Sequence, residues 1–170
     1  MSAELIAEIE AAFGKAELGI GLSLHQAKAM DLLQSPEEVL EARPLDPETR
    51  WQDIPDTKVE EFHYALTFLD PESLRFHLPR FMVYALENPG VDSPAVDAAV
   101  YACDFGEEME QDVLAQFNAM SRSQMKTVAH FLVHIAESKD EDYDTMVAAI
   151  ALDTFWFQFL DEVPEIDLDR

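Results

Sequence analysis

The chain has 170 residues, of which 35 are acidic and 11 are basic, so its formal net charge is −24. Because 48% of the residues are hydrophobic, the chain can bury a core, which excludes a wholly disordered acidic polypeptide. The charge argues against binding to nucleic acid or to an anionic membrane and permits a basic partner.

Three helices are predicted before residue 44. Ser2 is a capping residue, and apolar side chains follow it at helical spacing. A glycine-rich stretch over 14–22, where we expect at most a short hairpin, separates this helix from the next. Ser35-Pro36 is a strong start signal, since serine caps a helix and proline fits its first turn. The predicted ranges are 3–13, 23–33 and 35–43.

The middle of the chain is predicted to form a loop and two or three further helices. Residues 44–56 contain three prolines and form a loop anchored by Trp51 and Ile54. A helix over 57–69 follows, and Asp70-Pro71 caps another. Pro79 is predicted to break that helix, because proline disfavours the helical conformation of the residue before it. The helix would then restart at Pro79 and end at Glu87.

Helical patterns continue to the C-terminal region. Ser93-Pro94 opens a helix over 96–103, residues 107–119 form a helix with a charged face, and Ser121 with Gln124 forms a capping box for a helix that ends near Glu137. We therefore predict an all-α protein, a single irregular orthogonal bundle of six to eight helices. The helical domain is expected over residues 1–163, followed by an acidic tail over 164–170.

The last predicted helix, ending near Leu160, is apolar on two faces. Met146, Ile150 and Phe157 lie on one face, and Leu152 lies on roughly the opposite one. Such a helix is either central to the bundle, as the pattern favours, or covered by a partner. Asp153 lies within it and is a candidate binding residue. A buried Asp153 would need hydrogen-bond partners or a raised pKa, whereas the commoner arrangement is a solvated carboxylate.

A histidine pair is the strongest catalytic candidate. His130 and His134 are one turn apart on a single helix, and Glu137 follows them. Two imidazoles at this spacing can bind a divalent transition metal, with the carboxylate as a third ligand. Phe131 stands where a zinc protease helix carries its glutamate. The commoner arrangement for such a pair is two ordinary histidines on a helix surface.

The remaining chemistry-bearing residues point to no particular reaction. His77 precedes Pro79 and is either a general base or a packed ring that donates to a backbone carbonyl. Cys103 has apolar neighbours and is expected to be a buried, inert thiol. The chain contains no GxxxxGK[ST], GxGxxG or GxSxG sequence, so nucleotide binding and serine hydrolysis are not favoured.

Cysteine content and hydrophobic patterning give an expected compartment. One cysteine excludes an intrachain disulfide and fits a reducing compartment. No signal peptide is expected at the N-terminus, and no run approaches the roughly 18 apolar residues of a membrane span. We therefore expect a cytoplasmic protein without a membrane partner. Its oligomeric state is left open.

Two segments carry a family resemblance. Trp51-Gln52-Asp53-Ile54-Pro55 follows the pattern W-x-x-I-P, and residues 75–82 follow R-F-[YH]-L-P-x-[YF]-M. With Ser121-x-x-Gln124 before His130, they resemble a family of small uncharacterised bacterial proteins, a domain of unknown function. The resemblance covers most of residues 13–137. It implies a shared fold and places Trp51, Arg75, His77 and Pro79 around one local structure. Arg75 is then a structural ion-pair partner or a contact for an anion or substrate.

Three functional hypotheses follow. The first is a non-enzymatic interaction module that binds a basic protein, as an immunity or inhibitor protein binds a cationic toxin. The second is a metal-dependent enzyme that uses His130, His134 and Glu137. The third is a DNA mimic, whose carboxylates occupy the groove of a DNA-binding protein. An enzyme is the less favoured class, and no cofactor is expected apart from the divalent transition metal of the second hypothesis.

Overall fold

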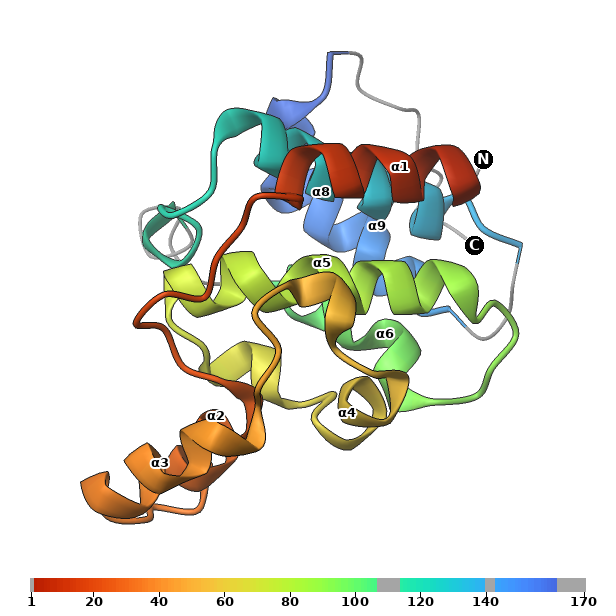
Figure 1. Cartoon of the computed structure of the whole chain (residues 1–170). Helices are drawn as coiled ribbons and strands as arrows, with labels where there is room; N and C mark the ends of the chain where they lie inside the picture. The colour runs from red at the N-terminus through yellow and green to blue at the C-terminus, as the bar shows by residue number, and fades with distance from the viewer. Residues whose placement is uncertain (1, 107–113, 140–142, 162–170) are drawn as a thin grey trace.

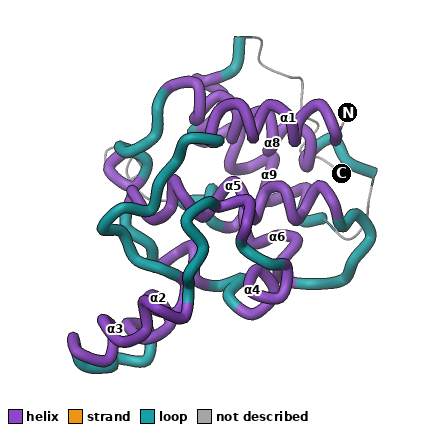
Figure 2. The backbone as a smooth tube through the Cα atoms, in the orientation of Figure 1, coloured by secondary structure: helices purple, strands orange, loops and turns teal. Residues whose placement is uncertain are grey.

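The protein is helical throughout the residues that the structure describes. The computed structural model describes residues 2–106, 114–139 and 143–161. Figures 1 and 2 show helices joined by loops, with no strand in these ranges, which confirms the predicted all-α class. The predicted tail over 164–170 lies outside the described residues, as does most of the predicted helix over 107–119.

The described residues form eight α-helices and four short 3-10 helices. The α-helices are α1 (Ser2–Phe13), α2 (Leu24–Asp31), α3 (Pro36–Ala42), α4 (Asp56–Glu61), α5 (Pro71–Glu87), α6 (Pro94–Tyr101), α8 (Arg122–Ala136) and α9 (Thr145–Thr154). The short 3-10 helices are η1 (Arg43–Leu45), η2 (Trp51–Asp53), η3 (Ala65–Phe68) and η4 (Trp156–Phe159).

Several helices begin at the cap residues that the sequence predicts. The Asp70 side chain accepts hydrogen bonds of 3.1 Å from two backbone N–H groups in the first turn of α5. Ser35 and Ser93 each precede a proline in the first turn of their helix. Ser121 and Gln124 form the predicted capping box of α8. These caps satisfy N–H groups that the first helical turn cannot pair internally.

Helix α5 continues through Pro79, so the predicted break there is wrong. It runs unbroken from Pro71 to Glu87. A proline inside a helix costs about 3 kcal/mol, because it removes one hydrogen bond and crowds the preceding turn. However, every side chain from Phe76 to Leu86 is buried. Each large apolar side chain that is buried contributes about 1.5–3 kcal/mol, so tertiary packing outweighs the local preference of proline.

The core lies around α5. Helices α1, α4 and α6 pack against α5, and α8 packs against α1 and α9. Figure 1 shows α1 running alongside α5, above it in this view, with α8 and α9 behind them. The buried apolar side chains of the described residues form one connected core that extends from Leu5 to Trp156. No helix in this part of the chain is both long and apolar enough to cross a membrane.

Two further local predictions differ from the structure. The predicted helix over 57–69 is divided into α4 and η3. Residues 14–22 form an irregular loop, which agrees with the expectation of at most a short hairpin there. The last helix ends at Thr154, because Phe155 has non-helical angles of φ −143° and ψ −48°. This turn carries Trp156 into the core, where its Nε1 donates to the carbonyl of Cys103 at 2.9 Å. A buried hydrogen bond therefore offsets the end of the helix.

Helix α9 is buried on one face only. Ala148, Ala151 and Leu152 are buried, whereas Met146 and Ile150 are about 40% exposed. One of the two apolar faces of α9 therefore packs into the core, as a helix at the centre of the bundle requires. The other face is left partly uncovered by the described residues.

Candidate functional site

Asp46 is the centre of a polar network beside α2. It follows η1, and only 6% of its side chain is exposed. One carboxylate oxygen accepts a hydrogen bond from the backbone N–H of His25 at 2.8 Å. The other oxygen lies 2.8 Å from His25 Nδ1 and 2.8 Å from Lys58 Nζ. The loop after α3 is thereby tied to the start of α2 and to α4.

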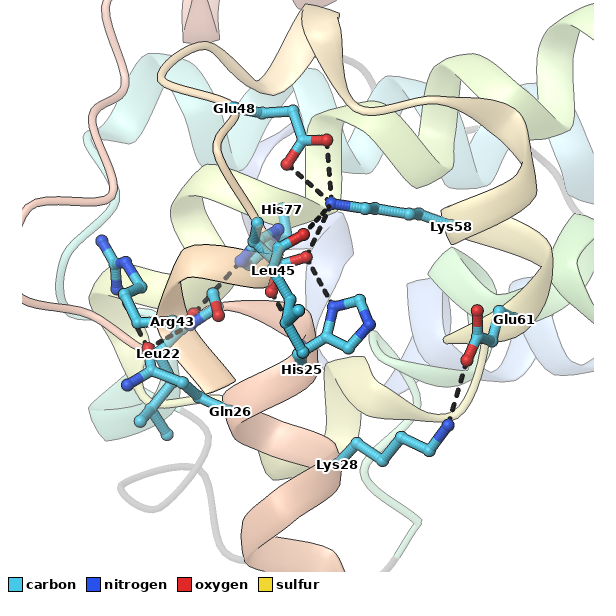
Figure 3. Close-up of polar contacts among 12 residues, drawn as sticks. Leu22, His25, Gln26, Lys28, Arg43, Leu45, Glu48, Lys58, Glu61 and His77 are labelled. Atoms are coloured by element: carbon cyan, nitrogen blue, oxygen red, sulfur yellow. Dashed lines mark hydrogen bonds and ion pairs between the residues drawn. The ribbon is translucent and has the colours of Figure 1, made fainter. Parts of the chain in front are cut away.

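Lys58 completes this network from α4. Its ammonium group also donates to the carbonyl of Leu45 at 3.0 Å and to the Glu48 carboxylate at 2.8 and 2.9 Å, as Figure 3 shows. Asp46, His25, Lys58 and Glu48 are called the polar network below. Its members come from a helix start, a loop and a second helix, so it fixes the position of the loop.

The network keeps Asp46 ionised. Burial raises the pKa of its carboxyl group, but hydrogen bonds from Lys58, Ser23 and His25 outweigh burial and lower the pKa to about 2. Burial likewise lowers the pKa of Lys58, yet its bonds to Asp46 and Glu48 raise it above the usual value. Both groups are charged at neutral pH, as an ion pair with several hydrogen bonds requires.

His77 is a buried neutral histidine close to the network. Its side chain on α5 is 2% exposed, and its Nε2 lies 3.2 Å from the carbonyl of Leu22. Because a carbonyl oxygen only accepts, Nε2 carries the proton. Burial lowers the pKa of His77 to about 4. His77 is therefore a packed ring that donates to a backbone carbonyl, the second of the two roles predicted for it.

A cleft of about 870 Å³ opens between the loops 14–19 and 43–50. Arg43 joins its walls: the guanidinium donates to the carbonyl of Gly19 at 3.1 Å, to Gln26 Oε1 at 3.1 Å and to the carbonyl of Gly21. Asp46 and Glu48 also line the cleft, so the polar network forms part of its wall. This volume lies within the range of small-molecule sites.

Trp51 on η2 and the α5 residues Arg75 and His77 contact different segments. Trp51 is 1% exposed, and its Nε1 donates to the carbonyl of Phe13 at 3.0 Å. Arg75 is two residues from His77 on α5 and therefore points to another side of the helix. Its Nη1 donates to the carbonyl of Ala119 at 3.2 Å. The structure thus does not bring these side chains together into one contact group.

The histidine pair lies against α1. The Nδ1 atom of His130 is 2.9 Å from a carboxylate oxygen of Glu8, and His134 Nε2 is 3.4 Å from the hydroxyl of Ser2. Glu137 is exposed at the end of α8. Among the described residues, no group of three or more His, Cys, Asp or Glu side chains is arranged to hold a metal ion. The metal hypothesis stays a prediction, to be checked by metal analysis of protein purified without a histidine tag.

The other candidates differ in burial. Asp153 is exposed on α9, as the solvated alternative requires. Cys103 is fully buried, and burial raises the pKa of its thiol, as expected for an inert cysteine.

Sequence spacing gave no sign of the polar network. Its contacts join residues that are 21 and 12 positions apart, from His25 to Asp46 and from Asp46 to Lys58. No helical or strand periodicity relates such positions. The available signal is the loop 43–50, whose charged side chains stand among prolines. Loops held by a rigid scaffold often carry functional residues.

A second feature is the hairpin of α2 and α3, which projects from the rest of the protein (Figure 1). Helix α3 buries none of its residues. Large apolar side chains of the hairpin are 47% to 92% exposed: Met30, Leu32, Leu33 and Leu40. Exposed carboxylates stand among them, with no basic residue between positions 30 and 42: Asp31, Glu37, Glu38 and Glu41. These eight residues are called the hairpin surface below.

Fold and site together define a small, acidic, all-helical protein with a charged cleft and an exposed helical hairpin. The chain belongs to the family of unknown function DUF6714, whose family model matches residues 1–160. The resemblance to a domain of unknown function is thereby confirmed. No curated protein and no solved structure matches the chain.

Proposed function

We propose that this protein is a non-enzymatic interaction module that binds a basic protein through the hairpin surface. The observation that carries the proposal is Leu33, whose side chain is 92% exposed and whose φ is 53°. A leucine in this left-handed region costs about 1–2 kcal/mol relative to an ordinary conformation. Glycine is the usual residue at this position after a helix. The hydrogen bonds that end α2, such as that from Gln34 N–H to the carbonyl of Ala29 at 3.0 Å, account for the left-handed backbone. A contact with a partner would account for an exposed leucine in place of glycine.

The apolar side chains of the hairpin surface supply the binding energy in this proposal. Burying one large apolar side chain contributes about 1.5–3 kcal/mol. Single exposed leucines are ordinary on protein surfaces. Here four large apolar side chains share one projecting hairpin, and α3 contributes nothing to the core of its own chain. Such a cluster is typical of a protein–protein contact.

The charges of the hairpin surface select the partner. Four exposed carboxylates without a neighbouring base favour a cationic surface that offers an apolar groove. Complementary charge raises association rates and makes them sensitive to salt. A cationic toxin, held by an immunity or inhibitor protein, has this chemistry. A DNA-binding protein has it too, in which case the acidic protein acts as a DNA mimic. In either role we place the protein in the cytoplasm, where its buried thiol stays reduced.

The experiment uses the untagged full-length protein, coupled to a support, to capture proteins from a native lysate at low and high salt. A double variant, Leu33→Gly with Leu40→Ala, removes two exposed leucines. The glycine relieves the backbone strain at position 33, so the variant keeps its fold. A control, Ile150→Ala, shortens an apolar side chain on α9 that is 40% exposed and lies outside the hairpin surface.

The proposal requires a basic protein that the wild type and the control capture in equal amounts. The double variant should bind this protein at least about tenfold more weakly, since each lost leucine contact exceeds about 1.4 kcal/mol. High salt should also weaken the capture. Competition of the captured protein by duplex DNA would assign the DNA-mimic role. Equal capture by the wild type and the double variant at both salt concentrations would refute the proposal.

A further inference from the structure

The cleft between the loops 14–19 and 43–50 is unusual in its charge. Three basic side chains line it, Lys15, Arg43 and Arg50, although the whole chain holds only 11 Lys and Arg residues. Lys28, Arg80 and Lys126 form ion pairs elsewhere in the protein, and Lys58 pairs with a carboxylate of the cleft wall. None of the three lining cations forms an ion pair with a carboxylate of the described residues. The cleft therefore gathers three cations that form no ion pair within the described part of the chain.

The carboxylates in the same wall do not cancel this charge. Asp46 and Glu48 both bind Lys58, with N–O distances of 2.8 Å. His25 takes part of the remaining hydrogen-bonding capacity of Asp46. Glu17 is the third acidic lining residue, and it is exposed. The lining itself carries three cations and three carboxylates. Lys58 lies outside the lining but binds two of these carboxylates, which brings the local balance to +1 in a chain of net charge −24.

Arg43 is held ready for a ligand. Its guanidinium makes three hydrogen bonds, to the Gly19 and Gly21 carbonyls and to Gln26. An arginine has five N–H donors, so two remain for another acceptor. Because all three partners are uncharged groups, the positive charge of Arg43 stays uncompensated. A fixed guanidinium loses little side-chain entropy when an anion binds.

Lys15 and Arg50 complete the arrangement from opposite walls. Lys15 follows the end of α1, and Arg50 stands just before the buried Trp51. The hydrogen bond from Trp51 to the carbonyl of Phe13 ties these two walls together at 3.0 Å. Both basic side chains are exposed and can move toward a ligand between them.

We infer that this cleft binds a small polyanion, a molecule whose phosphate or carboxylate groups are held by Lys15, Arg43 and Arg50. Arginine forks match phosphate and carboxylate oxygens in pairs, and lysine adds a mobile point charge. The site is separate from the hairpin surface and requires no catalytic step. The overall negative charge of the protein repels anions from most of the surface, so a cleft that gathers three cations favours anion binding locally.

The test titrates the full-length protein with pyrophosphate and, separately, with citrate, followed by amide chemical shifts in two-dimensional NMR spectra. Lys15→Ala and Arg50→Ala each remove one exposed cation that makes no ion pair with a described residue. Lys139→Ala is the matched control, because it removes the same charge from an exposed position outside the cleft. Thermal unfolding verifies that each variant is folded.

The inference requires saturable shifts concentrated in residues 14–19 and 43–50. Lys15→Ala and Arg50→Ala should each weaken binding about tenfold, as the loss of a charge-assisted contact does, while Lys139→Ala binds as the wild type. Tighter binding of pyrophosphate would assign a phosphorylated ligand, and tighter binding of citrate would assign a polycarboxylate. The inference is overturned if neither probe gives saturable shifts, if the shifts lie elsewhere, or if all three variants weaken binding equally.

Discussion

Buried His77 makes the stability of this protein dependent on pH, and the dependence can be isolated with one substitution. His77→Gln keeps a donor near the carbonyl of Leu22 and removes the titrating ring. We expect the variant to be less stable than the wild type near pH 8, because packing and hydrogen-bond geometry change in the core. We expect this difference in stability to narrow as the pH falls. In the wild type, His77 binds a proton when the chain unfolds, so acid favours unfolding of the wild type, whereas the variant has no such group.

The magnitude follows from the pKa of His77. Burial lowers it from 6.5 to about 4, and one pKa unit corresponds to about 1.36 kcal/mol. Between these two values the unfolded chain binds a proton that the folded protein does not, so stability falls as the pH falls. The stability is complete above about pH 6.5, and the full loss, reached near pH 4, is about 3 kcal/mol. From pH 8 to pH 5 the loss is about 2 kcal/mol.

The assay is urea unfolding of both proteins at several pH values from 8 to 5, followed by circular dichroism. The free energy of unfolding is compared between the two proteins at each pH, and the constant difference near pH 8 serves as the internal reference. Burial lowers the pKa of His134, so it adds a slope of the same sign to both proteins. Subtraction removes that slope. Parallel curves at all pH values would refute a buried, neutral His77.

Two further predictions concern the charges. Asp46→Asn should lower the free energy of unfolding at pH 7 by about 1–2 kcal/mol once solvent screening is included, because the pKa of Asp46 is about 2 and its carboxylate holds Lys58. This loss of stability should vanish as the pH falls from about 4 through 2. The control Asp153→Asn removes an exposed charge and should change stability little. Equal losses in the two variants would contradict a special role for Asp46. The melting temperature of the wild type should also rise from low to moderate ionic strength, because salt screens the repulsion of a chain of net charge −24. A melting temperature independent of salt would mean that the carboxylates are well compensated.

The helical architecture could be predicted from the sequence because its signals are local. Cap residues such as Ser35, Asp70 and Ser121 act within one turn of the helix they start. Pro79 shows the limit of local signals. Pro79 disfavours the helical conformation of the residue before it, yet the burial of α5 decides the outcome. Phe155 shows the opposite case, since the helix ends there so that Trp156 reaches a partner in the core.

The candidate site could be predicted only in part, because it is built from contacts between distant segments. His77 and Trp51 could be selected from the sequence because they are aromatic residues close to prolines. Both rings are buried, and each donates a hydrogen bond to a backbone carbonyl. Asp46 and Lys58 looked like any other charged residues of an acidic chain. Their importance arises from burial and from each other, and neither property can be read from composition or periodicity.

The cleft and the hairpin surface both depend on the position of helix α2. Arg43 lines the cleft and bonds Gln26 on α2, and Asp46 in the cleft wall bonds both the backbone and the ring of His25 at the start of the same helix. Helix α3 adds no buried residue, so the position of the hairpin is set by the base of α2. Forming the polar network requires the desolvation of several charged groups, and its hydrogen bonds hold the hairpin of α2 and α3 in place against the rest of the protein. Two sites that bias one rigid element can influence each other's affinity, and the influence is reciprocal. An anion bound in the cleft is therefore placed to change the affinity of the hairpin surface for its partner.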